Sequence, residues 1–174
     1  MSIVMITGGS RGIGASAALQ CADRGMGVVL TYQTNADAAG AVVDRIQQKG
    51  GAAVALQLDV GETGSFAGFK SRLEEALASV WHANQLQGLV NNAGHGLYNL
   101  IETVTEVQFD ALMNVHLKGP FFLTQVLLPL LAKGSGIVNV TSATTRVATS
   151  GVAPYAAFKG GLEVLSRYMA KEFG

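Results

Sequence analysis

Short apolar runs alternate five times with longer segments of helical period, and this alternation limits the possible folds more than any other feature. The apolar runs are rich in Val, Ile and Leu without in-and-out alternation, which is typical of parallel strands covered on both faces. They span residues 3–7, 28–32, 53–58, 88–91 and 136–141. Segments of helical period follow them, at 12–24, 37–49, 62–81, 104–131 and 154–173. The order predicts an α/β fold, a doubly wound parallel sheet with helices on both faces.

Length and composition narrow the class of protein. A chain of 174 residues without a linker or repeat is about one domain's worth, so we expect a single domain over residues 1–174. Twelve basic residues balance twelve acidic ones with no basic stripe, which argues against nucleic-acid binding. No apolar segment is long enough to span a membrane, and no signal peptide is evident. The single cysteine, Cys21, excludes an internal disulfide and fits a reducing compartment, so we expect a cytoplasmic protein.

A glycine-rich segment, Thr7 to Gly14, joins the first strand to the first helix. Glycines at this point permit a tight turn and allow the backbone to approach a pyrophosphate, which the N-terminus of the next helix then binds. An ordinary strand-to-helix turn would account for a lone glycine pattern equally well. The position after the first strand favours nucleotide binding, because that is where such a motif is expected.

The spacing T-G-x-x-x-G-x-G resembles the cofactor loop of the short-chain dehydrogenase/reductase family. A Rossmann-like fold is what this resemblance implies. Strand four ends Asn91-Asn92-Ala93-Gly94, which is similar to the N-N-A-G signature of the same family, although a tight turn would explain the same letters. The residues that the resemblance implies for cofactor binding are Gly8, Ser10, Arg11, Gly12, Ile13, Gly14, Asp59, Asn91, Ala93, Gly94, Tyr155 and Lys159.

The end of strand two bears on which dinucleotide is bound. An NAD site usually places an acid there to bind the ribose 2′-hydroxyl, but this chain has no acid before Asp37. Arg11 is suited to a bidentate contact with a 2′-phosphate, unless it is a solvated surface charge. We therefore expect NADP rather than NAD.

Asp59 has two interpretations. It matches the family aspartate that contacts the adenine ring. With Glu62 three residues later, it also fits a capping box at the start of the next helix.

Tyr155 and Lys159 are four residues apart at the start of the last helix, after the strand that ends at Ser142. This spacing places phenol and ammonium on one helical face. A free tyrosine has a pKa of ~10, and lowering that pKa by ~3 units requires ~4 kcal/mol of extra stabilisation of the phenolate. A neighbouring positive charge favours the phenolate and supplies stabilisation of this kind. The pair alone is weak evidence, but it follows the glycine loop and N-N-A-G in the family's order.

Family resemblance supplies the individual roles. Tyr155 is implied as the general acid or base, and Ser142 as a hydrogen-bond donor to the substrate oxygen. Lys159 is implied to lower the pKa of the tyrosine and to bind the nicotinamide ribose. Asn114 matches the asparagine that disturbs the long helix and anchors a water chain to the lysine. Phe158 departs from the family, which has a small residue there.

The function implied is an NADP-dependent oxidoreductase that interconverts a ketone and a secondary alcohol, similar to the 3-oxoacyl-carrier-protein reductases. One alternative is a non-catalytic NADP-binding fragment or degenerate homologue, and another is a flavodoxin-like interaction domain without cofactor. His82, His95 and His116 show no metal-ligand spacing, so no metal is expected. His95 directly follows Gly94, which is consistent with a position at the border of a substrate pocket or in a surface loop.

Two expectations concern the whole molecule. Family members usually continue beyond the position of Gly174 into further strands, so we expect the functional protein to contain more chain and the last strand here to be an unpaired edge. The low charge and the two long helical segments, 104–131 and 154–173, suggest a buried helix-pair interface, and the family resemblance implies a homodimer or homotetramer joined in that way.

Overall fold

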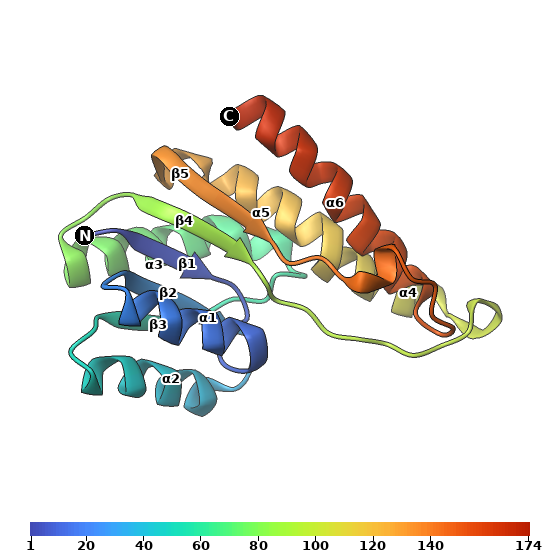
Figure 1. Ribbon diagram of the computed structural model, residues 1–174, viewed down its shortest axis with the longest axis horizontal. Helices are drawn as coiled ribbons and strands as arrows, with labels where there is room; N and C mark the ends of the chain where they lie inside the picture. Colours follow the sequence, from blue (N-terminus) through green and yellow to red (C-terminus); the bar gives the residue numbers. More distant parts are fainter.

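Five strands form one parallel sheet in the computed structural model, which describes residues 1–174. The strands are β1 (Ile3–Ile6), β2 (Gly27–Tyr32), β3 (Ala53–Gln57), β4 (Leu86–Asn91) and β5 (Leu131–Asn139). Their order across the sheet is β3-β2-β1-β4-β5 (Figure 1). The chain reverses its direction across the sheet between β3 and β4. The carboxyl ends of β1 and β4 therefore flank the switch point at which sheets of this kind bind ligands.

Helices cover both faces of the sheet, as the sequence predicts (Figure 1). On one face, α1 (Gly12–Asp23) and α2 (Ala36–Gln48) contribute Ala18, Val42 and Ile46 to a core with β1 and β2. On the other face, α3 (Phe66–Trp81) and α5 (Gly119–Leu127) contribute Phe69, Leu73, Leu123 and Leu127. The predicted Rossmann-like, doubly wound fold is confirmed.

Burial differs between the middle and the edge of the sheet. All four residues of β1 and the first five of β2 are buried, as expected of strands covered on both faces. β5 is only partly covered, and Val138 is 55% exposed. The expectation of two covered faces is therefore wrong for β5, which lies at one edge of the sheet.

The helical segment predicted at 104–131 is several elements rather than one helix. α4 (Glu106–Met113) begins at a capping box formed by Thr105 and Gln108, and a π-helical turn (Asn114–Lys118) joins it to α5. A 3₁₀ turn (Leu128–Leu130) follows, and β5 begins at Leu131. Pro129 accounts for the early end of the helix, because it supplies no backbone N–H and restricts the residue before it.

The last helix, α6 (Ala153–Phe173), runs beside β5 and packs on α4 and the π-helical turn (Figure 1). Phe158 meets Phe109 of α4 edge-to-face, with 4.8 Å between ring centroids. Asn139 of β5 donates to Ser166 Oγ at 2.8 Å. None of the helices has both the length and the apolarity needed to cross a membrane. Short 3₁₀ turns occupy Thr63–Ser65, Ile101–Thr103 and Ala143–Thr145.

Candidate active site

A cleft of about 610 Å³ lies at the carboxyl edge of the sheet, where the segments after all five strands come together. Most of the residues singled out from the sequence line it: Gly8, Ser10, Arg11, Gly12, Ile13, Asp59, Ala93, Gly94, Tyr155 and Lys159. Gly14, Asn91, Asn114 and Ser142 are not among its lining residues, although Thr141, next to Ser142, is. The structure thus brings ten of the predicted positions to one cleft.

The loop after β1 is joined to the end of β4 by side chains. Thr7 Oγ1 accepts hydrogen bonds from the backbone N–H groups of Asn92 at 2.9 Å and Ala93 at 3.0 Å. Asn92 in turn donates to the carbonyl oxygens of Thr7 at 2.8 Å and Gly8 at 3.2 Å. The N-N-A-G segment is therefore part of the glycine loop's support, which a simple tight turn would not require.

Glycine is required at two positions of this loop. Gly8 has φ +66°, and a Cβ there would lie 2.8 Å from Ala93 Cα. A Cβ on Gly14 would come within 2.5 Å of Asn92 Nδ2 and closer still to the carbonyl oxygen of Gly8. The close approach of β1, α1 and the β4 end therefore depends on the absence of side chains.

The N-terminus of α1 faces the cleft with free donors. Its N-cap residue, Arg11, provides no side-chain cap, and no acid lies in the first turn. Gly12 has φ +57° and faces open space, since a Cβ there would meet nothing within 4 Å. Uncapped amides, a helix N-terminus and an open glycine surface suit a phosphate group.

Asp59 lies at the far side of the cleft from Tyr155 and Lys159 and contacts the segment after β2. Its carboxylate accepts hydrogen bonds from Gln33 Nε2 at 2.7 Å and from the backbone N–H of Gly61 at 2.8 Å. The capping-box interpretation is wrong, because Asp59 caps no helix: a 3₁₀ turn starts at Thr63 and α3 only at Phe66. The Asx-type turn to Gly61 delays the helix. Contact with an adenine ring stays a prediction.

Arg11 is exposed at the mouth of the cleft, and its guanidinium has no hydrogen-bond or salt-bridge partner in the structure. Tyr32 and Gln33, at the end of β2, line the same part of the cleft, and neither is acidic. The unpaired Arg11 cation is suited to a phosphate monoester, and the one carboxylate at this end, Asp59, already accepts a hydrogen bond from Gln33.

Tyr155 and Lys159 lie side by side on α6. Lys159 Nζ is 5.9 Å from the centroid of the Tyr155 ring, and both residues line the cleft. Lys159 is only 4% exposed, and its ammonium donates to the carbonyl oxygen of Val140 at 2.6 Å. Burial lowers the pKa of Lys159 from its ordinary 10.5 to about 8. A fixed cation, still charged near neutral pH, therefore stands next to the phenol.

Ser142 begins the 3₁₀ turn before α6. Its Oγ accepts hydrogen bonds from the backbone N–H of Thr144 at 3.2 Å and from the Thr144 hydroxyl at 2.9 Å. Two accepted bonds leave the Ser142 proton free to be donated to a further oxygen. Thr145 Oγ1 bonds Glu163 of α6 at 2.7 Å, which fastens the serine turn to the helix that carries Tyr155.

Sequence reasoning selected Asn114 in the π-helical turn, but the residues of that turn that line the cleft are Val115 and His116. His116 is 1% exposed, and its ring meets that of Tyr155 edge-to-face at 4.9 Å. Asn114 contributes its backbone carbonyl, which accepts from the Gly119 N–H. His116 follows the buried Leu112 by four residues, so helical spacing places it on the inward face, and that spacing is the signal in the sequence that could have found it. His95, in the loop after β4, also lines the cleft.

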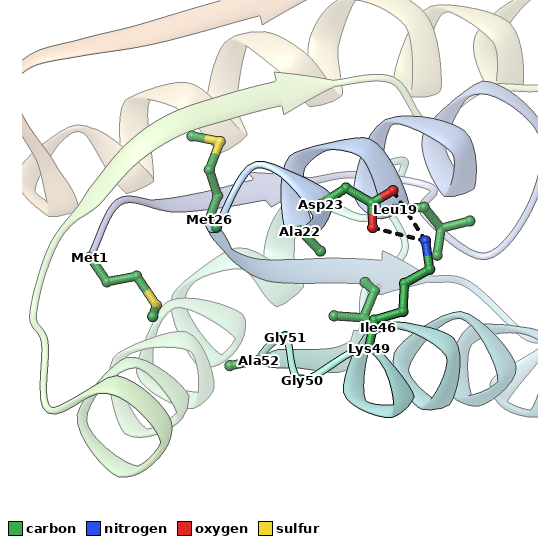
Figure 2. A pocket seen from close by; sticks show the side chains of 11 residues that line it. Met1, Leu19, Ala22, Asp23, Met26, Ile46, Lys49, Gly50, Gly51 and Ala52 are labelled. Carbon is green, nitrogen blue, oxygen red and sulfur yellow. Dashed lines mark hydrogen bonds and ion pairs between the residues drawn. The ribbon is translucent and has the colours of Figure 1, made fainter.

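A second hollow, of about 360 Å³, lies at the opposite, amino edge of the sheet between α1 and α2 (Figure 2). Its only charged side chains are Asp23 and Lys49, which form an ion pair at 2.9 Å. None of the residues predicted from the sequence lies there. No group of three or more His, Cys, Asp or Glu side chains in the chain is arranged to hold a metal ion.

Known proteins resemble this chain over nearly its whole length. A family model described as short chain dehydrogenase matches residues 2–174. A probable tetrahydroxynaphthalene reductase of Zymoseptoria tritici is 35% identical over 175 residues, which cover 99% of this chain and 62% of that protein. A 3-oxoacyl-(acyl-carrier-protein) reductase of Staphylococcus epidermidis is 35% identical over 170 residues, which cover 97% of this chain and 67% of that protein.

A solved structure of landomycin C-6 ketoreductase LanV with bound NADP and rabelomycin matches with a TM-score of 0.92 and 36% identity, covering 98% of this chain and 71% of that one. The chain thus spans less than two thirds of the length of the tetrahydroxynaphthalene reductase. Its fold, its glycine loop and the match of the family model agree, and the chain belongs to the short-chain dehydrogenase family.

Proposed function

We propose that the protein is an NADP-dependent oxidoreductase that interconverts a ketone and a secondary alcohol, with residues 1–174 forming one dinucleotide-binding domain. The observation that carries this proposal is the buried Lys159 ammonium beside Tyr155, in the same cleft as the glycine loop. A phenol next to a fixed cation is the acid-base group that carbonyl reduction needs, and a glycine loop is what a dinucleotide needs.

Tyr155 gives its proton to the carbonyl oxygen during reduction and takes it back during alcohol oxidation. The ionised phenolate that remains after proton transfer is stabilised by the neighbouring Lys159 ammonium. Ser142 donates its free hydroxyl proton to the same substrate oxygen. Lys159 is held in place by the Val140 carbonyl at 2.6 Å, so its charge stays fixed while the proton moves.

The residues of the cleft fit a nicotinamide dinucleotide. Gly12 leaves room for the pyrophosphate on the uncapped amides of α1, Gly8 and Gly14 allow the close packing beneath it, and Asp59 with Gln33 faces the adenosine end. When bound, the nicotinamide supplies or accepts the hydride. Asn91 acts from behind this surface, because its amide bonds Asn139 and Thr124 and keeps β4, β5 and α5 together.

Arg11 and the lack of an acid at the end of β2 support NADP over NAD. Several similar solved proteins also carry this nucleotide: LanV and a metagenomic short-chain oxidoreductase with NADP, and a blue fluorescent protein with NADPH. Replacing Arg11 by Ala should therefore weaken NADPH binding about tenfold or more and change NADH binding little, because one charge-assisted contact contributes ~1.5–3 kcal/mol.

A 3-oxoacyl thioester is the substrate class that the similarity to the Staphylococcus reductase supports. Arg146 is exposed in the turn after Ser142, where it is placed to meet an acidic carrier or substrate tail.

A cytoplasmic location is supported by the single free cysteine. A homodimer or homotetramer is supported by the exposed apolar side chains on α4, α5 and α6, such as Val107, Phe121 and Val164.

A panel of ketones and 3-oxoacyl thioesters, assayed with NADPH and NADH, tests the proposal. We expect NADPH oxidation with at least one ketone by the wild-type protein and its loss in Tyr155→Phe. Calorimetry of NADPH binding separates the alternative, a non-catalytic NADP-binding protein, which would bind NADPH without turnover. Equal activity of the wild type and Tyr155→Phe would contradict the proposed role of the tyrosine.

A further inference from the structure

His116 is a buried titratable group for which the proposed reaction has no role so far. It is 1% exposed in the π-helical turn, and it lines the cleft. Its ring meets the Tyr155 ring edge-to-face, with 4.9 Å between centroids and 85° between planes. On another side it presses against Gly94, where a Cβ would lie 2.6 Å from His116 Cε1. The histidine therefore fills the wall of the cleft directly behind the tyrosine.

The surroundings of His116 determine its tautomer. Its Nε2 lies 2.7 Å from the carbonyl oxygen of His95, and a carbonyl can only accept, so Nε2 carries the proton. Burial, partly opposed by the hydrogen bond to the His95 carbonyl and assisted by the Lys159 charge, lowers the pKa of His116 to about 4. The titratable groups that face the ring are Lys159 and Tyr155 on α6 and His95 in the loop after β4. At neutral pH the imidazole is uncharged, with a lone pair on Nδ1.

That lone pair has no partner within the chain. His116 Nδ1 is one of only two buried side-chain nitrogen or oxygen atoms without a hydrogen bond, and the other is Trp81 Nε1, which packs against Gly27 at the amino end of β2. Buried polar atoms are nearly always hydrogen-bonded, and leaving one unpaired costs about 1–3 kcal/mol. An orphan acceptor in the cleft wall therefore points to a donor that arrives from the cleft.

We propose that His116 is a positioning residue of the acid-base site: anchored on the His95 carbonyl, it holds the Tyr155 ring from behind and offers Nδ1 as acceptor to a water molecule in the cleft. This inference rests on the proposed function. Because the ring stays neutral, Lys159 is the only cation next to the phenol. The water molecule bound by Nδ1 is thereby held at a fixed position in the cleft, close to the hydroxyl proton that Tyr155 exchanges.

Three substitutions separate the parts of this arrangement. His116→Gln keeps a donor near the Nε2 position and loses the Nδ1 acceptor, whereas His116→Asn keeps an acceptor near Nδ1 and loses the anchor. His116→Phe keeps an aromatic ring against Tyr155 and loses both nitrogens. His82→Asn serves as the control, because His82 is exposed and outside the cleft, with φ 51°, a conformation that asparagine tolerates.

The first measurement needs neither nucleotide nor turnover. Nitrogen-15 NMR of histidine-labelled full-length protein, with His116→Phe for assignment, reports the tautomer and the titration of His116. We expect the neutral Nε2–H form from pH 8 down to pH 5, with the Nδ1 shift of a hydrogen-bonded lone pair. A proton on Nδ1, a bare lone pair or protonation above pH 6 would overturn the proposal.

The second measurement compares kcat for ketone reduction, KM and the NADPH dissociation constant. We expect His116→Gln and His116→Phe to lose kcat about tenfold, the equivalent of one hydrogen bond, while NADPH affinity and melting temperature stay near those of His82→Asn. His116→Asn should keep more activity than His116→Gln. Wild-type kcat in His116→Gln, or an equal loss in both amide variants, would overturn the role of Nδ1. If the wild type reduces no ketone, the proposed function fails, and the NMR measurement alone decides on His116.

Discussion

The two edges of the sheet use similar residues for different purposes. At the carboxyl edge, glycines lie under a cleft of about 610 Å³ that contains a buried lysine and an unpaired histidine nitrogen. At the amino edge, the glycines of a smaller hollow end helices, and its charged groups pair with each other. The difference shows that glycine and charge indicate a functional site only when they are not already accounted for by local structure.

The glycines make this contrast clear. Gly25 and Gly50 follow α1 and α2 with φ +78° and +80°, and added Cβ atoms would meet nothing within 4 Å. Their role is to end a helix. Gly14 lies within α1 and has no positive φ, but a Cβ there would clash with the backbone of Gly8 and the side chain of Asn92. Its role is the close approach of three segments beneath the cleft.

The charges differ in the same way. Asp23 and Lys49 are largely in solvent, with 48% and 62% of their side chains exposed. Lys159 is buried, has one carbonyl partner and has a pKa lowered by that burial to about 8. A buried cation without a carboxylate partner is costly to the fold, and such groups concentrate at functional sites.

The largest effect is expected from Tyr155→Phe, which removes only the phenolic oxygen. Turnover of ketone with NADPH should fall by about 10²–10⁴-fold, the usual contribution of a general acid, while the melting temperature stays within a few degrees. Steady-state kinetics measure this loss. Tyr98→Phe is the matched control, since Tyr98 is 70% exposed and lies outside the cleft, and it should keep full turnover. A comparable loss in both variants would remove the distinction between the site and the surface.

The glycine contrast is tested by Gly14→Ala against Gly50→Ala. Gly14→Ala should weaken NADPH binding by more than about tenfold, because the new methyl group displaces the loop that supports the nucleotide. Gly50→Ala should cost about 1–2 kcal/mol of folding free energy, because an alanine is strained at φ +80°, and leave NADPH binding unchanged. Calorimetry measures the NADPH affinity of the two variants, and denaturant unfolding measures their folding free energy. Weaker NADPH binding in Gly50→Ala would contradict the assignment of the two edges.

Lys159 should make activity and stability respond to pH in opposite directions. Its ammonium loses its proton in the folded protein at about pH 8, so the rate of ketone reduction should fall as pH rises through 8. The unfolded chain keeps the proton up to the ordinary pKa of 10.5, so the free energy of unfolding should rise between pH 8 and 10.5, by about 3 kcal/mol at most.

Lys159→Met removes both effects. Chemical denaturation from pH 6 to pH 10.5 gives the free energy of unfolding of the wild type and of the variant. The contributions of the other titrating groups cancel in the difference between the two. In the variant the stability gain above pH 8 should be missing. A difference that stays constant over this range would show that Lys159 is not desolvated as its burial indicates.

The smallest effect is expected at the amino edge. Lys49→Ala breaks the ion pair with Asp23, and an exposed pair of this kind contributes ~0.2–1 kcal/mol. Thermal unfolding at low and high salt measures it: the difference from wild type should be small and should shrink further with salt. NADPH binding should not change. A loss of more than about 2 kcal/mol in the free energy of unfolding would contradict the difference between the charges of this hollow and those of the cleft.

The sequence was sufficient for features that depend on neighbouring residues. Buried strands appear as unbroken Val, Ile and Leu runs, so all five were predictable to within a few residues except for the start of β5. The i, i+4 spacing placed Tyr155 next to Lys159 because a helix has a fixed period.

Features that depend on tertiary contacts were not predictable. The partner of Asp59 is Gln33, 26 residues away in the segment after β2, so local spacing suggested a helix cap instead. The burial of His116 was predictable from its position four residues after the buried Leu112, but its contact with the ring of Tyr155 on another helix was not. Its importance follows only from the ring of Tyr155, the carbonyl of His95 and the unpaired Nδ1.

The central claim is that the carboxyl edge, and not the amino edge, is the site of nucleotide chemistry. A crystal structure of the full-length protein grown with NADPH tests it most directly. We predict a pyrophosphate on the backbone amides that open α1, a 2′-phosphate at Arg11 and a nicotinamide beside Tyr155 and Lys159. A nucleotide seated in the hollow of Asp23 and Lys49, or a carboxyl-edge cleft that stays empty at saturating NADPH, would contradict the account.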